Sequence, residues 1–230
     1  MARMIALALA GLLVVPAAQA AEVVGAETAL EYSTFTSDLD DYNKLTARGS
    51  LELALSPELS FQGDLSLSQL GFIDESAQAA GVHMIYNFSQ FSLGAFVGKD
   101  WLDSGNADYY GLEGATSIGM INAQAYMARV DQRHDDGTIF GAQGSFDATP
   151  VWSVGGRYDH ARIDSEDTYR LSLTTGYTIG SFKLTGELGR AEVSDSGSET
   201  FVGVGAKMTF GPNGGTTFGQ RGLLSILPGL

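Results

Sequence analysis

Polar and apolar residues alternate over long stretches of this 230-residue chain. The stretches Lys44 to Leu53, Leu59 to Ser68 and Tyr169 to Tyr177 are clear examples. Successive side chains of a β-strand point to opposite faces, so each stretch has one apolar and one polar face. An amphipathic helix would place apolar residues at intervals of three and four, and these stretches lack that spacing. The pattern therefore predicts strands.

The same pattern recurs along most of the chain. We predict twelve strands, at residues 27–36, 43–55, 58–70, 77–88, 90–101, 107–118, 121–131, 138–147, 151–162, 168–179, 182–193 and 200–210. Most have the length of about ten residues or more that a tilted strand needs to cross a bilayer. A sheet in lipid must close, because the N–H and C=O groups of an open edge would have no partners.

The fold class we predict is all-β: a transmembrane, antiparallel, up-and-down β-barrel of about twelve strands over residues 21–210. The alternative is a soluble β-sandwich or lipocalin-like barrel with its apolar face inward. The distribution of side chains disfavours that alternative, because the polar face carries the charges whereas the other face carries the leucines and aromatic residues.

The first twenty residues read as a cleaved signal peptide. Arg3 precedes an apolar run at 5–15, and Ala18-Gln19-Ala20 is a small-x-small cleavage site. An uncleaved N-terminal anchor is the alternative. The predicted domains are therefore the signal peptide at 1–20, the barrel at 21–210 and a C-terminal tail at 211–230.

Composition removes several function classes. The chain has no Cys, which excludes disulfide scaffolds, thiolate metal sites and cysteine nucleophiles. Its formal net charge of −14 is unsuited to nucleic acid, which binds basic surfaces.

Acidic residues gather in every second connection between the predicted strands. The odd-numbered connections, counted from the first, hold 17 of the 27 acidic residues: Asp38, Asp40, Asp41, Asp74, Glu75, Asp100, Asp103, Asp108, Asp131, Asp135, Asp136, Asp164, Glu166, Asp167, Glu192, Asp195 and Glu199. The even connections are tight and hold only Glu58 and Asp147. This sorting predicts two different ends, with the odd turns outside the cell and the even turns in the periplasm.

Aromatic residues flank both sets of turns, as in the interfacial girdles of membrane barrels. Those near even turns are Phe61, Phe88, Phe91, Phe146, Trp152, Tyr177, Phe182 and Phe210, and those near odd turns are Tyr42, Phe72, Trp101, Tyr109, Tyr110 and Tyr169.

The last predicted strand ends Gly205-Ala206-Lys207-Met208-Thr209-Phe210. With its terminal Phe it resembles the C-terminal assembly signal of bacterial outer-membrane proteins, for which Gly205, Met208 and Phe210 are the matching residues. Together with the strands, this segment makes residues 27–210 similar to a small Gram-negative outer-membrane porin. The resemblance implies localisation in the outer membrane and insertion by the outer-membrane assembly machinery. It departs from the family pattern in that residues 211–230 follow the signal.

The predicted lumen face is rich in Ser, Thr and Gly, which leave space and hydrate readily. We therefore expect a narrow, water-filled channel for passive diffusion of small polar solutes or ions. The predicted pore-lining residues are Lys44, Arg48, Asp64, His83, Glu113, Arg157, Arg170, Lys183, Glu187 and Lys207.

Six of these residues, Arg48, Asp64, His83, Glu113, Arg157 and Glu187, are expected at similar depth near the bilayer midplane. We predict that Arg48 and Arg157 face Asp64 and Glu113 there and set ion selectivity. The alternative is a salt-bridge network that seals the lumen.

An enzymatic function has little support in the sequence. Of the three histidines, His134 lies in a predicted turn and His83 on the predicted lumen face, and the chain has no nucleophile elbow, zinc-protease motif or phosphate loop. We expect no catalytic residue, no bound metal and no cofactor. A lipid-modifying enzyme and a non-conducting structural barrel stay open as alternatives.

The expected partners are the lipid bilayer, lipopolysaccharide bridged to the acidic turns by divalent cations, and small polar solutes; a second copy of the chain is a further candidate. For the tail at 211–230 three placements are open: a plug in the lumen, contact with the inner rim, or a free end.

Overall fold

The computed structural model describes residues 21–36, 42–71, 75–102, 105–132, 135–164, 166–193 and 197–228. They form twelve strands: β1 (Glu22–Phe35), β2 (Asn43–Ala54), β3 (Leu59–Leu70), β4 (Glu75–Asn87), β5 (Phe91–Leu102), β6 (Gly105–Ile118), β7 (Ile121–Gln132), β8 (Asp136–Asp147), β9 (Trp152–Ile163), β10 (Glu166–Ile179), β11 (Phe182–Val193) and β12 (Gly197–Phe210). Among these residues, no helix has the length and apolar character needed to cross a bilayer.

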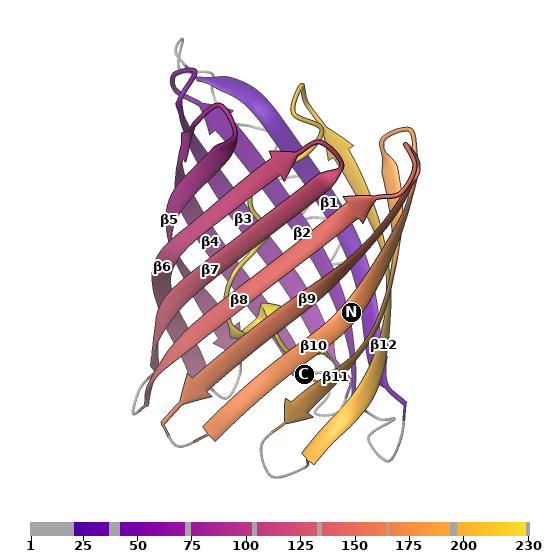
Figure 1. Ribbon diagram of the computed structural model, residues 1–230. Helices are drawn as coiled ribbons and strands as arrows, with labels where there is room; N and C mark the ends of the chain where they lie inside the picture. The colour runs from indigo at the N-terminus through magenta and orange to yellow at the C-terminus, as the bar shows by residue number, and fades with distance from the viewer. Residues whose placement is uncertain are drawn as a thin grey trace.

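Each strand pairs antiparallel with its neighbours in sequence, and the first strand closes on the last (Figure 1). The closing ladder joins β1 to β12 from Ala26 opposite Phe210 to Phe35 opposite Phe201. No edge of the sheet is left open to lipid, which satisfies the requirement that led to the prediction. The predicted twelve-stranded antiparallel barrel is therefore confirmed.

Several strands are longer than predicted. β1 begins at Glu22, five residues before the predicted start, because a register shift between Val23 and Gly25 interrupts the alternation there. β10 begins at Glu166, which pairs with Ile163, since the ladder of hydrogen bonds continues where the side chains are already polar. The alternation of polar and apolar residues identifies only the part of a strand that has one apolar face. It does not detect the polar residues by which a strand continues beyond that part.

The outer surface of the barrel is an apolar belt. In β4, Val82, Met84 and Tyr86 are about half exposed, whereas His83 and Ile85 between them are buried inside. In β10 the most exposed large apolar residue, Leu173, is 72% exposed. Large apolar side chains in this arrangement need lipid as solvent, so the barrel is a transmembrane one.

The aromatic girdle predicted beside the even turns is present on the outer surface. All eight of its residues are exposed: Phe61, Phe88, Phe91, Phe146, Trp152, Tyr177, Phe182 and Phe210. At the odd-turn end Trp101 and Tyr110 are exposed in the same way. The prediction that Tyr109 belongs to this girdle is wrong, since its side chain is 2% exposed and lies in the interior.

One predicted member of the acidic outer turns is also inside the barrel. Asp100 has no exposed surface, because it lies on the inner face of β5 near the odd-turn end. Several residues of the sequence predictions lie outside the described residues: the signal peptide at 1–20, and Asp38, Asp40, Asp41, Phe72, Asp74, Asp103, His134 and Asp195.

The tail, residues 211–228, enters the barrel from the even-turn end. It leaves β12 at Gly211, whose φ of 86° is favourable only for glycine, and runs inside the sheet to a short 3₁₀ turn at Leu223–Ser225. Figure 1 shows it as the yellow segment within the barrel. From Gly215 onward its side chains are buried or half-buried.

Candidate functional site

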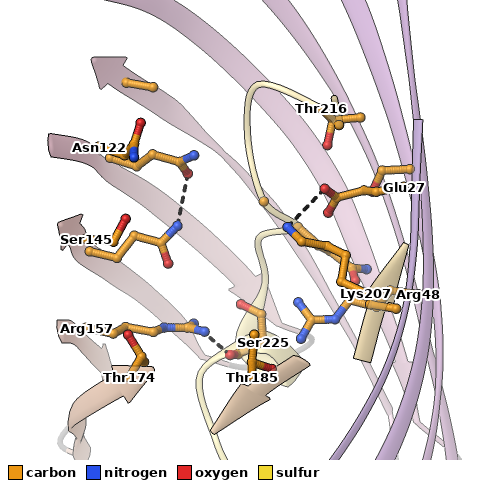
Figure 2. A pocket seen from close by; sticks show the side chains of 18 of the residues that line it. Glu27, Arg48, Asn122, Ser145, Arg157, Thr174, Thr185, Lys207, Thr216 and Ser225 are labelled. Carbon is orange, nitrogen blue, oxygen red and sulfur yellow. Dashed lines mark hydrogen bonds and ion pairs between the residues drawn. The ribbon is translucent and has the colours of Figure 1, made fainter. Parts of the chain in front are cut away.

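The interior of the barrel holds a cavity of about 930 Å³. Inward-facing residues of the strands line it together with one flank of the tail, and most of these residues are Ser, Thr, Gly, Asn, Gln or charged. Figure 2 shows Lys207 directed toward Glu27 on the neighbouring strand and Arg157 directed toward Ser225 of the tail. The wall of the cavity is therefore predominantly polar.

The charge of the cavity wall is opposite to that of the whole chain. Among the described residues that line it, seven are basic and four are acidic. The basic residues are Lys44, Arg48, Arg157, Arg170, Lys183, Lys207 and Arg221, and the acidic ones are Glu27, Glu31, Asp159 and Glu187. Thus a chain with a formal charge of −14 encloses a cationic cavity.

Six of the seven basic residues form one arc, which we call the basic arc: Lys44 and Arg48 on β2, Arg157 on β9, Arg170 on β10, Lys183 on β11 and Lys207 on β12. Closure makes the arc continuous, because β1 lies between β12 and β2. The acidic partners come from the same region of the wall. Arg48 pairs with Glu31 on β1, Lys207 with Glu27 on β1 at 3.1 Å, and Arg170 with Glu187 on β11 through its Nε at 3.0 Å.

The other predicted charged residues form a separate group, which we call the buried row. It consists of Asp64 on β3, His83 on β4, Glu113 on β6 and Arg221 of the tail. Nε2 of His83 lies 2.7 Å from Oδ2 of Asp64, its Nδ1 contacts Oε1 of Glu113, and Nε of Arg221 donates to Oε2 of Glu113 at 2.8 Å. Two carboxylates thus meet two basic side chains with almost no solvent contact, as buried charges require.

A glycine makes this row possible. Glu113 reaches His83 across β5, where Gly94 lies opposite Glu113 and Phe96 lies opposite His83. A Cβ on Gly94 would lie 3.0 Å from Cγ of Glu113 and 2.8 Å from the ring of Phe218. The missing side chain therefore leaves the space in which β4, β6 and the tail meet.

Apolar residues fill part of the interior toward the odd-turn end. Ile226 and Leu223 of the tail pack into this cluster, whose buried wall residues are Phe96, Ala107, Tyr109, Tyr126, Ala128, Val130, Ile139 and Ala161. A second cluster, Phe35, Ala191 and Phe201, lies at the same end. The polar part of the lumen accordingly lies between the basic arc and the tail.

The ten predicted pore-lining residues thus divide into two groups. Lys44, Arg48, Arg157, Arg170, Lys183, Glu187 and Lys207 line the cavity, whereas Asp64, His83 and Glu113 belong to the buried row. That Arg48 and Arg157 face Asp64 and Glu113 across the lumen and set ion selectivity stays a prediction, but the nearest partners of the two arginines are other carboxylates. Arg48 pairs with Glu31 and Arg157 with Asp159, because acidic residues two positions away or on the adjacent strand share the same face.

Sequence reasoning missed the wall residues that bind the tail. Alternation places Glu52, Gln62 and Gln124 on the lumen face, but nothing in the local sequence indicates that a segment far along the chain would pair with them. The signal that could have found them is the apolar cluster beside Arg221 in a Gly-rich tail, which suggests docking without specifying a partner.

The arrangement around His83 does not resemble a catalytic site. Its ring nitrogens contact carboxylates, and its ring stacks between Phe96 and Phe218 at centroid distances of 5.6 and 6.2 Å. Within the described ranges, no group of three or more candidate ligands is arranged to hold a metal ion. Gly205, Met208 and Phe210 of the predicted assembly signal lie on β12, which closes the barrel; their role in assembly stays a prediction.

Comparison with known proteins gives matches in structure alone. No family model and no curated protein matches the sequence. Among solved structures, a KdgM porin is 14% identical with a TM-score of 0.59, covering 81% of this chain and 99% of its own. A NanC porin is 7% identical with a TM-score of 0.65, covering 79% of this chain and 98% of its own.

The COG4313 outer-membrane channel of Pseudomonas putida F1 is 14% identical with a TM-score of 0.60, covering 86% of this chain and all of its own length. These proteins share the fold at identities too low to carry over binding residues. The similarity to these structures agrees with three features of the barrel itself: its outer apolar belt, its even number of strands and its closed antiparallel ladder. The chain therefore has the fold of the small outer-membrane β-barrel porins.

Proposed function

We propose that this protein is a porin that forms a narrow, water-filled path for passive diffusion of small polar solutes or ions, with the even turns in the periplasm. The observation that carries the proposal is the polar, cationic cavity inside a closed twelve-stranded barrel. A barrel that served only as a membrane scaffold could fill its interior with apolar side chains. This one keeps about 930 Å³ beside the basic arc.

The charge of the path favours anions. Arg221 is paired with Glu113, which leaves six basic side chains against four acidic ones on the cavity wall. This excess gives a positive potential in a confined space with low-dielectric walls, which concentrates anions and repels cations. One of the similar structures is a KdgM porin in complex with an oligogalacturonate, which is a polyanion. Small anionic solutes, including short acidic sugars, are thus the solute class that we propose.

A second candidate is a non-conducting barrel. The observation in its favour is the docked tail, which together with the apolar cluster occupies the interior toward the odd-turn end. We propose no enzymatic activity, because His83 is engaged by two carboxylates and two aromatic rings.

Recording from purified protein in planar bilayers distinguishes these candidates. We expect small, discrete conductance steps and, across a KCl gradient, a reversal potential of the sign that anion preference gives. A folded barrel, recognised by its heat-dependent shift in electrophoretic mobility, that produces no steps at any voltage would reject the porin. Steps with cation preference would retain the porin and reject the solute class.

A further inference from the structure

The barrel wall binds the backbone of the tail. The side-chain amide of Gln62 on β3 pairs with both backbone groups of Phe218: Nε2 donates to the carbonyl oxygen at 2.7 Å, and the backbone N–H donates to Oε1 at 3.1 Å. Gln62 is 1% exposed, so this pairing is shielded from water. A side-chain amide that pairs with the N–H and the C=O of the same residue binds groups that every peptide backbone carries, whatever its side chains.

The pairing with Gln62 is one of several on both sides of Phe218. Glu52 accepts the backbone N–H of Thr217 at 2.8 Å, and Gln124 donates to the carbonyl oxygen of the same residue at 2.9 Å. Further along, Asp100 accepts the N–H of Leu224 at 3.0 Å. Glu52 and Asp100 have no exposed surface, so the tail backbone supplies donors to carboxylates buried in the wall.

The basic arc binds the far end of the tail in the same way. Lys44 donates to the carbonyl oxygen of Leu224 at 2.8 Å, Arg157 to that of Ser225 at 2.8 Å and Arg170 to that of Ile226 at 3.1 Å. Three basic side chains of the proposed solute path therefore donate hydrogen bonds to the tail. A solute that needs these cations competes with the tail for them.

Side chains of the tail occupy places formed by the wall. The ring of Phe218 stacks on His83 and lies over Gly94. The guanidinium of Arg221 lies 4.3 Å from the ring centroid of Tyr126 and completes the buried row. Ile226 is fully buried in the apolar cluster. Backbone and side chains are thus matched over the stretch from Thr217 to Ile226.

From these contacts we infer that the lumen contains a peptide-binding site, that the tail is its tethered occupant, and that release of the tail widens the path. The inference rests on the proposed porin function for its consequence, the change in conductance. The peptide site itself stands on the contacts alone. The residues after β12 thus act as a plug that belongs to the same chain as the barrel.

The surroundings of the tail allow release. One flank of the segment borders the cavity, so water can replace it without a rearrangement of strands. Its root contains Gly211, Gly214 and Gly215, all with positive φ, and nothing lies within 4 Å of a Cβ added at Gly214. The root is held to β1 by the hydrogen bond from the N–H of Asn213 to the carbonyl oxygen of Val24 at 2.9 Å, so release would pivot beyond this point, where Gly214 has open space around it.

Two glycines within the tail supply a matched test. At Gly222 φ is 111°, and an added Cβ would lie 2.6 Å from Oδ1 of Asp100, whereas a Cβ at Gly219 meets nothing within 4 Å. Gly222→Ala should strain the seated tail and shift it toward release about tenfold or more, whereas Gly219→Ala should leave it seated. Both variants keep the barrel sequence intact.

Release has a readout that does not depend on current. In an Ile226→Cys background the single thiol starts from a position that is fully buried while the tail is seated, so its rate of modification by a small charged maleimide reports release. We expect Gly222→Ala to increase both this rate and the mean conductance. An unchanged rate would overturn the peptide site, and a faster rate with unchanged conductance would overturn the plug. A faster rate without any current in any variant would reject the porin function and retain the peptide site.

A cross-link tests the same inference in the opposite direction. In a Gln62→Cys, Phe218→Cys double variant, a short reducible cross-linker between the two thiols should hold conductance at its lowest level until a reducing agent restores it. A conductance that does not respond to locking and release would overturn the plug even if Gly222→Ala failed to fold.

Discussion

Arg221 of the tail and Glu113 of β6 form an ion pair that solvent hardly reaches. The two atoms, Nε and Oε2, are 2.8 Å apart, and the side chains are 5% and 0% exposed. Through Glu113 the pair continues to His83 and Asp64, so the tail supplies one of the two basic side chains of the buried row. The wall and the tail are therefore electrostatically incomplete without each other.

Replacing Arg221 with Ala should lower the stability of the barrel. Loss of one partner from a buried pair costs about 3–5 kcal/mol when the remaining charge stays buried, and water entering the vacated space will reduce that cost. We expect a decrease of about 2 kcal/mol in the free energy of unfolding, measured in detergent or lipid by urea titration of tryptophan fluorescence.

The matched control is an ion pair of the same chemistry outside the lumen. Arg162 pairs with Asp167 at 2.8 Å with side chains 63% and 43% exposed. Arg162→Ala should cost less than about 1 kcal/mol, because water screens the pair. Equal decreases in the free energy of unfolding for the two variants would mean that the buried pair with the tail stabilises the barrel no more than an exposed pair does.

Ion selectivity should depend on the basic arc. Replacing Arg48 and Arg157 with Ala removes two positive charges from the cavity wall, and the reversal potential should move toward cation preference. Asp135→Ala at an odd turn should have little effect, since charges outside the lumen are screened within about 8–10 Å. An unchanged reversal potential in a conducting Arg48→Ala, Arg157→Ala double variant contradicts a role for the arc.

The buried carboxylates should behave differently from the arc. Asp64 and Glu113 contact His83 and Arg221 instead of the cavity, so Asp64→Ala with Glu113→Ala should leave two basic side chains unbalanced. We expect the double variant to lose stability and to release the tail. A stable barrel that changes only its anion preference would restore the simpler picture of two facing charged walls.

The strands could be predicted from the sequence because their signal is local. Each stretch such as 59–68 carries its own alternation, and the bilayer selects which face turns outward. The predicted inward orientation of His83 and Arg157 followed from this rule. Pairs such as Arg157 with Asp159 obey it as well, since residues two apart share a face.

The partners of side chains across the lumen could not be predicted, because these contacts depend on the absence of a side chain at some positions and on the backbone of a distant segment at others. The contact of Glu113 with His83 needs Gly94 between them, and the burial of Asp100 needs the backbone of Leu224. Neither condition has a periodic signature. The tail lacks alternation altogether, so its place in the lumen follows only from three-dimensional complementarity.

Divalent cations should stabilise the protein in lipopolysaccharide. Acidic residues that include Asp108, Asp131, Asp136 and Glu166 lie at the odd-turn end, where anionic headgroups would add repulsion. Chelation of Mg²⁺ and Ca²⁺ should therefore lower the unfolding temperature in lipopolysaccharide but not in a neutral detergent. If chelation changes neither temperature, the proposed bridging of turns to lipid is incorrect.

The outward face of β10 offers a test of the membrane-spanning depth. Leu173 near the middle of the strand is 72% exposed, and Ile179 at its even-turn end is 58% exposed. Six residues at about 3.3 Å each and a tilt near 45° separate them by about 14 Å along the bilayer normal. Leu173→Arg should cost about 2–4 kcal/mol of stability in bilayers, whereas Ile179→Arg should cost about 0–1 kcal/mol.

Both replacements put the same charge on the same face of one strand, so they differ mainly in depth. Folding into lipid vesicles, followed by the mobility shift of the folded barrel, gives the two free energies. In a detergent micelle, which adapts its thickness, the difference should shrink. Equal costs for Leu173→Arg and Ile179→Arg in bilayers would place the apolar belt elsewhere on the barrel.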